Sequence, residues 1–199
     1  MAIVVEHEKR RYEILEKALD IFTEEGYEDA TFQKIADRCG ITRTTLYLYF
    51  KNKREIFVWS IKQLTDSMEV TLRAMMKDKT VSYADCLETV LHAIIDRCTE
   101  NQRLFNVVLT YLLQAQKMGK EPDSRVKRRT IRLRHLLSQI IISGKNSGHF
   151  TDVNVKDANE LFYGLIESAI FRIAILGRTE NEECKAAVTL AIRGISIST

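Results

Sequence analysis

The chain has 199 residues, of which 45% are hydrophobic and 29% are charged. This composition excludes a disordered or fibrous protein, and the length suits either one large domain or a small domain joined to a medium one. The net charge of +3 is too small to identify a partner by itself.

The sequence predicts neither a membrane span nor a signal peptide. Residues 1–11 are too short and too acidic for a signal peptide, and the most apolar run, Leu161–Leu176, is interrupted by Glu167 and Arg172. The four cysteines show neither close pairing nor the spacing of metal ligands. We therefore expect a cytoplasmic protein with reduced, buried thiols and with no metal, no cofactor and no membrane partner.

Apolar residues at helical spacing predict three helices within the first fifty residues. The first covers about 9–25 and ends at Gly26, which suits a left-handed cap. Thr31 offers an N-terminal cap for the second helix, Gly40 closes that helix, and Thr42 caps the third.

Six more helices are predicted downstream, and no pair of strands with a hairpin signal is present. Asn52 and Glu55 form a capping box at the start of the first of these six. The loop around Pro122 is the clearest break in the chain. The expected ranges are about 53–77, 82–98, 102–117, 124–145, 155–176 and 180–195, and Asn154 and Thr179 are the expected caps of the last two. The sequence therefore predicts an all-α fold with nine helices.

Positive charge is concentrated around the second and third predicted helices. Residues 31–54 hold six lysines and arginines against one acid, a net of +5, whereas residues 1–30 have a net of −5. A basic segment alone more often marks a solvated helix face. Together with the Gly40 turn and the three capped helix starts, it favours a helix-turn-helix that binds DNA.

The side chains of this segment suit both phosphate and base contacts. Arg43 can form two hydrogen bonds with a guanine edge, and threonine can offer a hydroxyl to a base or a methyl group to thymine. Capped helix starts, tyrosine hydroxyls and lysine suit phosphate oxygens, which position a protein without specifying sequence. Residues 9–11 are basic and could form an arm along the DNA. The candidate DNA-binding residues are Thr31, Thr42, Arg43, Thr44, Thr45, Tyr47, Tyr49 and Lys53.

Residues 10–57 resemble the N-terminal DNA-binding domain of TetR-family transcriptional regulators. The positions that carry the resemblance are Ala18, Phe22, Gly26, Tyr27, Thr31, Ile35, Ala36, Gly40, Ile41, Thr42, Leu46, Tyr47, Tyr49, Phe50 and Lys53. Thr44 departs from the pattern, because the family often has glycine or another very small residue there. The departure puts the closeness of the backbone to DNA in doubt and suggests a direct contact from Thr44.

The resemblance implies two domains, a three-helix helix-turn-helix domain over residues 1–52 and a helical ligand-binding and dimerisation bundle over residues 53–199. It also implies a homodimer on a palindromic operator in double-stranded DNA, released by an unidentified small-molecule effector. A repressor is favoured, although the sequence does not separate a repressor from an activator.

The last two predicted helices are the expected dimer surface, because a helix that is apolar on nearly every side needs several partners. The candidate dimer residues are Leu161, Leu165, Ile173, Val188, Ala191 and Ile192. The candidate effector-pocket residues are Trp59, Met68, Met75, Tyr83, His92, Phe105, Tyr111 and Tyr163, although such residues at helical spacing are more often ordinary core.

The alternative is a helical-bundle enzyme or small-molecule carrier whose N-terminal motif is structural. The sequence shows no paired carboxylates, Cys–His pair or phosphate-binding loop to support it. Glu88 and His92 lie four residues apart and could touch one metal, but no second pair matches them.

Overall fold

The structure is a computed structural model that describes residues 2–75, 80–119, 124–178 and 180–197. Nine α-helices lie within these residues, so the predicted all-α fold and helix count are confirmed. They are α1 (Ala2–Asp29), α2 (Phe32–Cys39), α3 (Arg43–Tyr47), α4 (Lys53–Met75), α5 (Tyr83–Glu100), α6 (Gln102–Lys117), α7 (Ser124–Asn146), α8 (Val155–Ala174) and α9 (Glu182–Ile195). The one β-type contact in the described ranges is an isolated antiparallel bridge between Phe150 and Ser196.

The first helix starts earlier than predicted, at Ala2. The range of α1 joins two helical stretches across a kink at Gly26, whose φ of 85° and ψ of 168° are not helical, so the helical geometry breaks where the prediction ended the helix, although ψ is not that of a left-handed cap. α7 ends at Asn146, within one residue of its predicted end. The cap predicted at Thr179 lies outside the described residues.

The chain divides into two compact units. The first unit comprises residues 1–68 and 106–127, and the second comprises residues 69–105 and 128–199. The predicted functional domains, 1–52 and 53–199, stay a prediction, because a division by packing need not coincide with a division by function. No helix in the described ranges is long and apolar enough to cross a membrane.

The core of the first unit is rich in aromatic rings. Phe57 on α4 is fully buried, and its ring centroid lies 4.9 Å from those of Phe22 and Tyr27 and 5.0 Å from that of Tyr111. α2 contacts both α1 and α3, and its buried face anchors it to them. This core joins the first three helices to the start of α4 and to α6.

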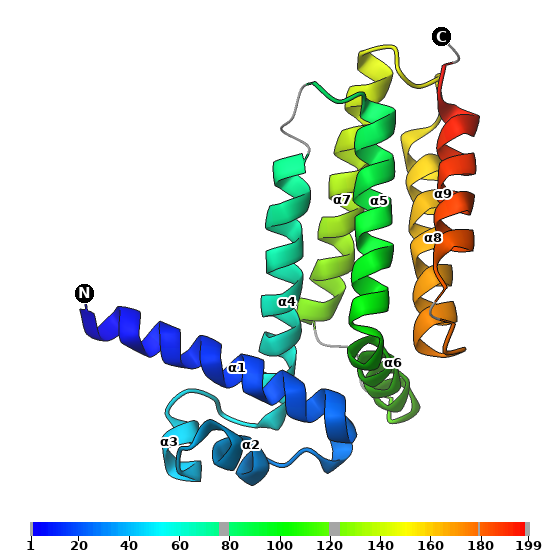
Figure 1. The fold of residues 1–199 in the computed structure, drawn as a ribbon. Coiled ribbons are helices and arrows are strands. Elements are labelled where there is room, and N and C mark those ends of the chain that lie inside the picture. The colour runs from blue at the N-terminus through cyan, green and yellow to red at the C-terminus, as the bar shows by residue number, and fades with distance from the viewer. Residues whose placement is uncertain (1, 76–79, 120–123, 179, 198–199) are drawn as a thin grey trace. The chain divides into compact units, whose positions relative to one another are not determined.

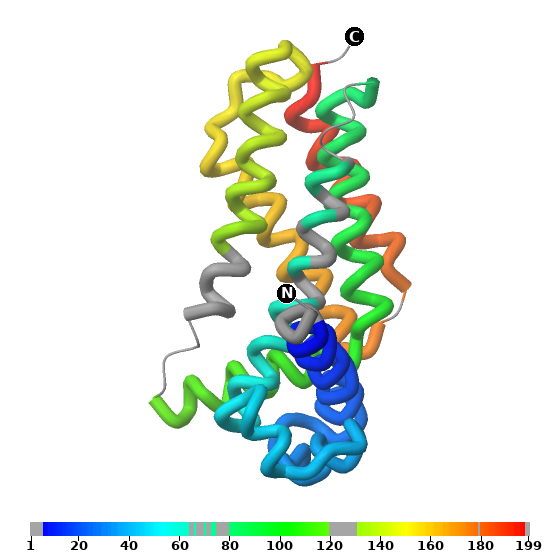
Figure 2. Tube along the Cα trace, turned by 90° about the vertical axis from the view of Figure 1, so that its left-hand side faces the viewer, coloured from blue at the N-terminus to red at the C-terminus, as the bar shows by residue number. Residues whose placement is uncertain are grey.

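The second unit is a helical bundle with a largely aliphatic core. α5, α7, α8 and α9 run side by side, as Figures 1 and 2 show from two directions. α5 contacts both α8 and α9, and it contributes the fully buried Leu87, Leu91 and Ile95. The end of α7 approaches its neighbours closely, because a Cβ atom at Gly144 would lie 2.3 Å from the Phe150 ring.

All four cysteines are free and buried, as predicted. Burial raises the pKa of the Cys98 thiol to about 12. This thiol therefore stays protonated at neutral pH, which makes it a poor nucleophile.

Candidate nucleic-acid interface

The turn between α2 and α3 has the predicted geometry. Gly40 adopts left-handed φ and ψ of 66° and 34°. Its N–H donates to the Asp37 carbonyl at 3.0 Å, and the N–H of Ile41 donates to the Ala36 carbonyl at 3.0 Å. These two bonds satisfy carbonyls that the end of α2 would otherwise leave unpaired. At the other end of α2, Thr31 Oγ1 accepts a backbone N–H of the first turn, so both predicted caps are confirmed.

The starts of α3 and α4 are capped by side chains. Thr42 Oγ1 accepts the backbone N–H of Thr45 at 3.1 Å. Asn52 Oδ1 accepts the N–H of Glu55 at 2.9 Å, while the Glu55 carboxylate reaches back to the N–H of Lys51 at 2.7 Å. Each cap satisfies a donor at a helix start, which confirms the predicted caps and fixes the direction in which each helix leaves its turn.

α3 is held by one buried residue and presents the others to solvent. Leu46 is fully buried, whereas Arg43, Thr44 and Tyr47 are exposed and Thr45 is half-buried. Leu48, at the end of the same helix, is 74% exposed. Sequence reasoning did not single out Leu48, although its place directly after the exposed Tyr47 was a usable signal.

Aromatic contacts orient the tyrosines of this surface. The Tyr47 ring lies against Phe32, with 4.6 Å between ring centroids, and Arg43 Nη2 donates to the Tyr47 hydroxyl at 3.3 Å. Tyr49 is half-buried and stacks on His7 of α1, with centroids 4.6 Å apart and planes 21° apart. α1 therefore supports Tyr49 directly, a contact that no local sequence signal predicts.

Residues 9–11 do not form an extended arm. They lie within α1, where Arg10 Nη2 donates to the Cys39 carbonyl at 3.1 Å. The Arg11 guanidinium lies 4.5 Å from the ring centroid of Trp59. The extended arm that the basic composition suggested is wrong for this structure, because residues 9–11 are helical and Arg10 and Arg11 tie α1 to α2 and α4.

Acidic residues of α1 neutralise part of the positive charge. Lys34 Nζ lies 2.7 Å from Glu25 Oε2, and Arg38 Nη2 lies 2.8 Å from Glu24 Oε2. The hydrogen bond from Arg38 lowers the pKa of the Glu24 carboxyl below its usual value. The net of +5 over residues 31–54 is therefore smaller at the surface than composition alone indicates.

Lys53 is engaged within the first unit. Its Nζ donates to the backbone carbonyls of Tyr27 at 2.7 Å and Glu28 at 3.0 Å, and it lies 4.5 Å from the centroid of the Tyr27 ring. An ammonium group has three donors, so these two bonds leave one N–H for a further acceptor. Lys53 thus joins the start of α4 to the end of α1.

The predicted effector-pocket residues are distributed over both units. Trp59 and Tyr111 belong to the first unit, and Tyr111 is part of its aromatic core. The members in the second unit are Tyr83, His92, Phe105 and Tyr163. The side chains of Met68 and Met75 lie outside the described residues. An effector cavity lined by these residues stays a prediction.

Glu88 and His92 take part in hydrogen bonds between α5 and α9. Glu88 accepts the hydroxyl of Thr189, and His92 Nε2 lies 3.2 Å from the carbonyl of Lys185. In the described ranges, no group of three or more histidine, cysteine or acidic side chains could hold a metal ion. The geometry gives these two residues a role in packing α9 against α5.

Half of the predicted dimer residues face the chain's own core. Ile173, Val188 and Ile192 are buried in the second unit, so a partner cannot reach them without unpacking it. The other three are accessible, with Leu161 exposed and Leu165 and Ala191 half-buried. Exposed apolar residues that the prediction omitted are Phe171, Ile175, Leu176 and Leu190.

A capped helix-turn-helix followed by a helical bundle defines a DNA-binding regulator. Residues 14–58 match the family model described as "Bacterial regulatory proteins, tetR family". Residues 14–58 are therefore a DNA-binding domain of the TetR family of bacterial transcriptional regulators, as the resemblance implied.

Curated relatives match most of the chain. The fatty acid metabolism regulator protein of Bacillus subtilis (strain 168) is 23% identical over 159 residues, which cover 79% of this chain and 80% of that protein. The uncharacterized HTH-type transcriptional regulator YfiR of the same organism is 26% identical over 180 residues, which cover 85% of this chain and 84% of that protein. The family model and these two relatives carry the names of regulators, and none of them is named as an enzyme.

Solved structures share the fold. A TetR transcription regulator from Haloarcula marismortui superposes with a TM-score of 0.84 at 22% identity, covering 96% of this chain and all of that one. The fatty acid degradation regulator FadR from Bacillus halodurans has a TM-score of 0.73 at 18% identity, covering 92% and 93%. The similarity thus extends from the helix-turn-helix through the helical bundle.

Proposed function

We propose that this chain represses its target genes by binding a palindromic DNA operator as a homodimer, and that a small-molecule effector releases it. The observation that carries the proposal is the exposed face of α3, where Arg43, Thr44 and Tyr47 lie beside Leu48 on a helix anchored by the buried Leu46. A short helix that presents cationic, hydroxyl and methyl groups suits the edges of bases in the major groove.

The contacts divide into two kinds. Arg43, Thr44 and Thr45 contact bases, and Leu48 adds an apolar contact to a thymine methyl group. The phosphate contacts come from the capped helix starts and from tyrosine and lysine side chains, namely Thr31, Thr42, Tyr47, Tyr49 and Lys53. Lys53 contributes through the one N–H that its bonds to the end of α1 leave available.

The proposed dimer surface is the exposed apolar stripe of α8 and α9. Leu161, Leu165 and Phe171 recur along one side of α8, Ile175 follows directly after that helix, and Leu190 on α9 is 72% exposed. One α3 covers only a few base pairs, so pairing across a two-fold axis supplies the second half-site. This stripe replaces the buried residues of the predicted interface.

The effector is proposed to bind within the helical bundle and to respace the two copies of α3. Coupling of about 1–3 kcal/mol weakens DNA binding by roughly 5- to 150-fold. The curated relative is a fatty acid metabolism regulator. We therefore propose fatty acids and their thioesters as the first effectors to test.

Gel-shift titration against DNA upstream of the gene, repeated at several salt concentrations, tests the proposal. Affinity falls as salt rises, because phosphate contacts release counterions. Arg43→Ala should lower affinity roughly 5- to 150-fold and relax the preference at one base pair. Arg97→Ala removes an exposed arginine of α5 and is the matched control, with affinity unchanged. Absent or salt-independent binding contradicts the proposal.

A further inference from the structure

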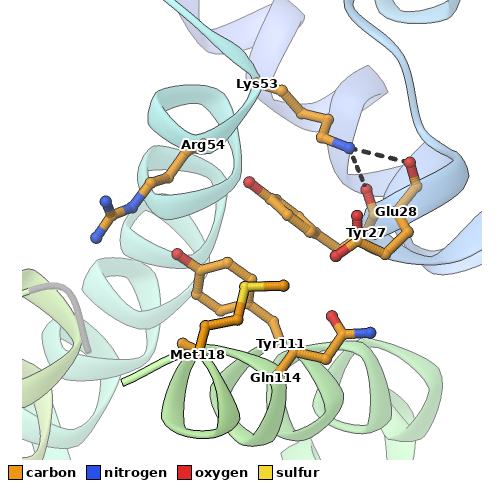
Figure 3. A pocket seen from close by; sticks show the side chains of 8 residues that line it. Tyr27, Glu28, Lys53, Arg54, Tyr111, Gln114 and Met118 are labelled. Carbon is orange, nitrogen blue, oxygen red and sulfur yellow. Dashed lines mark hydrogen bonds between the residues drawn. The ribbon is translucent and has the colours of Figure 1, made fainter. Parts of the chain in front are cut away.

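A pocket of about 310 Å³ lies within the first unit, apart from α3 (Figure 3). It is formed where the end of α1, the start of α4 and the end of α6 meet. The lining residues are Tyr27, Glu28, Lys53, Arg54, Tyr111, Gln114, Ala115 and Met118. Its volume is at the lower end of the range of small-molecule sites, which run from about 300 Å³ upwards.

One side of the pocket is apolar. Tyr27 and Tyr111 pack edge to face, with 4.7 Å between ring centroids and an interplanar angle of 62°. Met118 lies beside them in Figure 3 and is 65% exposed, and Ala115 adds a methyl group on α6. A thioether next to aromatic rings is an adaptable surface for a flat apolar group.

The other side is polar, and its charged residues are Lys53, Arg54 and Glu28. The Arg54 guanidinium is directed away from Lys53 in Figure 3, so Lys53 is the cation that faces the Tyr27 side of the pocket. Lys53 Nζ has two bonds to backbone carbonyls and therefore one further N–H. Gln114 on α6 offers an amide that can donate to an oxygen.

The tyrosine hydroxyl adds a neutral donor. Burial is the main cause that raises the pKa of Tyr27 to about 12. Its phenol is therefore protonated at neutral pH and can donate a hydrogen bond without adding negative charge. Figure 3 shows the Tyr27 and Tyr111 hydroxyls directed to the same side, toward α4.

We propose that this pocket binds a small aromatic carboxylate, with its ring against Tyr111 and Met118 and its acid group beside Lys53. Hydrogen bonds between a carboxylate and cationic donors are roughly twice as strong as neutral ones, so the charge dominates recognition. The site is separate from the effector cavity proposed within the helical bundle. Occupancy would place an anion next to Lys53, one of the proposed phosphate contacts.

The test is calorimetric titration of the full chain without DNA, using 2-naphthoate and the neutral 2-naphthamide. The acid should bind saturably, and the amide should bind at least about fivefold more weakly, because it lacks the charge. Gln114→Glu adds a like charge to the wall at nearly constant shape and should weaken 2-naphthoate by about fivefold. Gln116→Glu makes the same change at an exposed position of α6 outside the pocket lining and should leave the affinity unchanged.

A second readout locates the ligand without any substitution. The photoreactive aromatic carboxylate 4-benzoylbenzoate should label the peptides 104–117 or 118–120, which contain Tyr111 and Met118 and are released by cleavage after lysine and arginine. Labelling elsewhere, equal affinity for acid and amide, equal effects of the two glutamine substitutions, or no saturable binding would each overturn the proposal. Because DNA is absent from both measurements, none of these results bears on the proposed regulatory function.

Discussion

The two compact units are stabilised by different kinds of core. In the first unit, the rings of Phe22, Tyr27 and Tyr111 all contact that of Phe57. In the second unit, α5 packs aliphatic side chains against α8 and α9. Aromatic pairs are directional and add about 0.5–1.5 kcal/mol each beyond their buried area, whereas aliphatic burial has no preferred geometry.

The difference between an aromatic and an aliphatic core suits the two proposed roles, DNA binding for the first unit and association with another chain for the second. Directional contacts hold α1, α4 and α6 of the first unit in one arrangement, which suits a surface that must match DNA to within an ångström. The second unit leaves large apolar side chains exposed on α8 and α9, and Leu190 is the most exposed of them. Such a surface suits association with another chain.

Phe57→Ala and Phe162→Ala compare the two cores directly, because both rings are fully buried. Phe to alanine in a core costs about 3–5 kcal/mol, and Phe57 also loses three aromatic pairs. We expect Phe57→Ala to lower the free energy of unfolding by about 5 kcal/mol and Phe162→Ala by about 3 kcal/mol.

Urea unfolding followed by two probes measures the difference. Trp59 is the chain's one tryptophan and reports on the first unit, whereas far-ultraviolet circular dichroism reports on every helix. Coincident transitions in both probes justify a single free energy of unfolding. Equal losses for the two variants would show that the aromatic geometry adds nothing beyond buried area.

Leu190→Glu tests the exposed apolar stripe of the second unit. A carboxylate at the centre of an apolar interface loses water without gaining a partner, so dimer affinity should fall by about 100-fold or more. The matched control is Ile131→Glu on α7, which changes a residue that is also exposed outside the stripe. Sedimentation velocity should show monomers for the first variant and dimers for the second. A dimeric Leu190→Glu chain would place the interface elsewhere.

The caps of the first unit were predictable because their chemistry is local. Thr31, Thr42 and Asn52 each bond to an N–H within three residues, so spacing along the sequence was sufficient. Gly40 was predictable for a similar reason, because its left-handed conformation disfavours other residues.

Contacts between distant residues were not predictable. α8 is apolar on nearly every side, so periodicity could not show that Ile173 faces the core of the second unit while Phe171 faces solvent. The hydrogen bonds from Lys53 to the carbonyls of Tyr27 and Glu28 join residues about 25 positions apart in the sequence, and they depend on how α4 packs against α1. Composition alone gives the charge of a segment but not its ion pairs.

Gly40 in the first unit and Gly144 in the second resist replacement by a larger residue for different physical reasons. Alanine at Gly144 would place Cβ 2.3 Å from the Phe150 ring and 3.1 Å from Tyr83 Cβ. Overpacking costs about 1–3 kcal/mol, and an approach as close as 2.3 Å calls for the upper end of that range. A helix-propensity gain of about 1 kcal/mol offsets part of this cost and leaves about 2 kcal/mol. Alanine at Gly40 meets no atom within 4 Å, but the positive φ costs about 1 kcal/mol.

We therefore expect Gly144→Ala to lower stability by about 2 kcal/mol and Gly40→Ala by about 1 kcal/mol in thermal unfolding. Only Gly40→Ala should also weaken DNA binding, because it alters the turn that precedes α3. A Gly144→Ala chain as stable as the original would show that the Phe150 ring moves aside at little cost.

The smallest expected effect concerns the ion pairs between α1 and α2. Glu25→Gln removes the carboxylate partner of Lys34 and leaves its hydrogen bond to the Asp29 carbonyl, so the positive charge of the ammonium becomes available to a phosphate. Because an exposed pair contributes less than about 1 kcal/mol, DNA affinity should rise by roughly two- to fourfold at low salt, and the gain should shrink as salt increases. Glu16→Gln removes the same charge from an exposed position of α1 and controls for net charge. Equal gains in competition gel shifts would mean that overall charge, rather than the release of Lys34, limits binding.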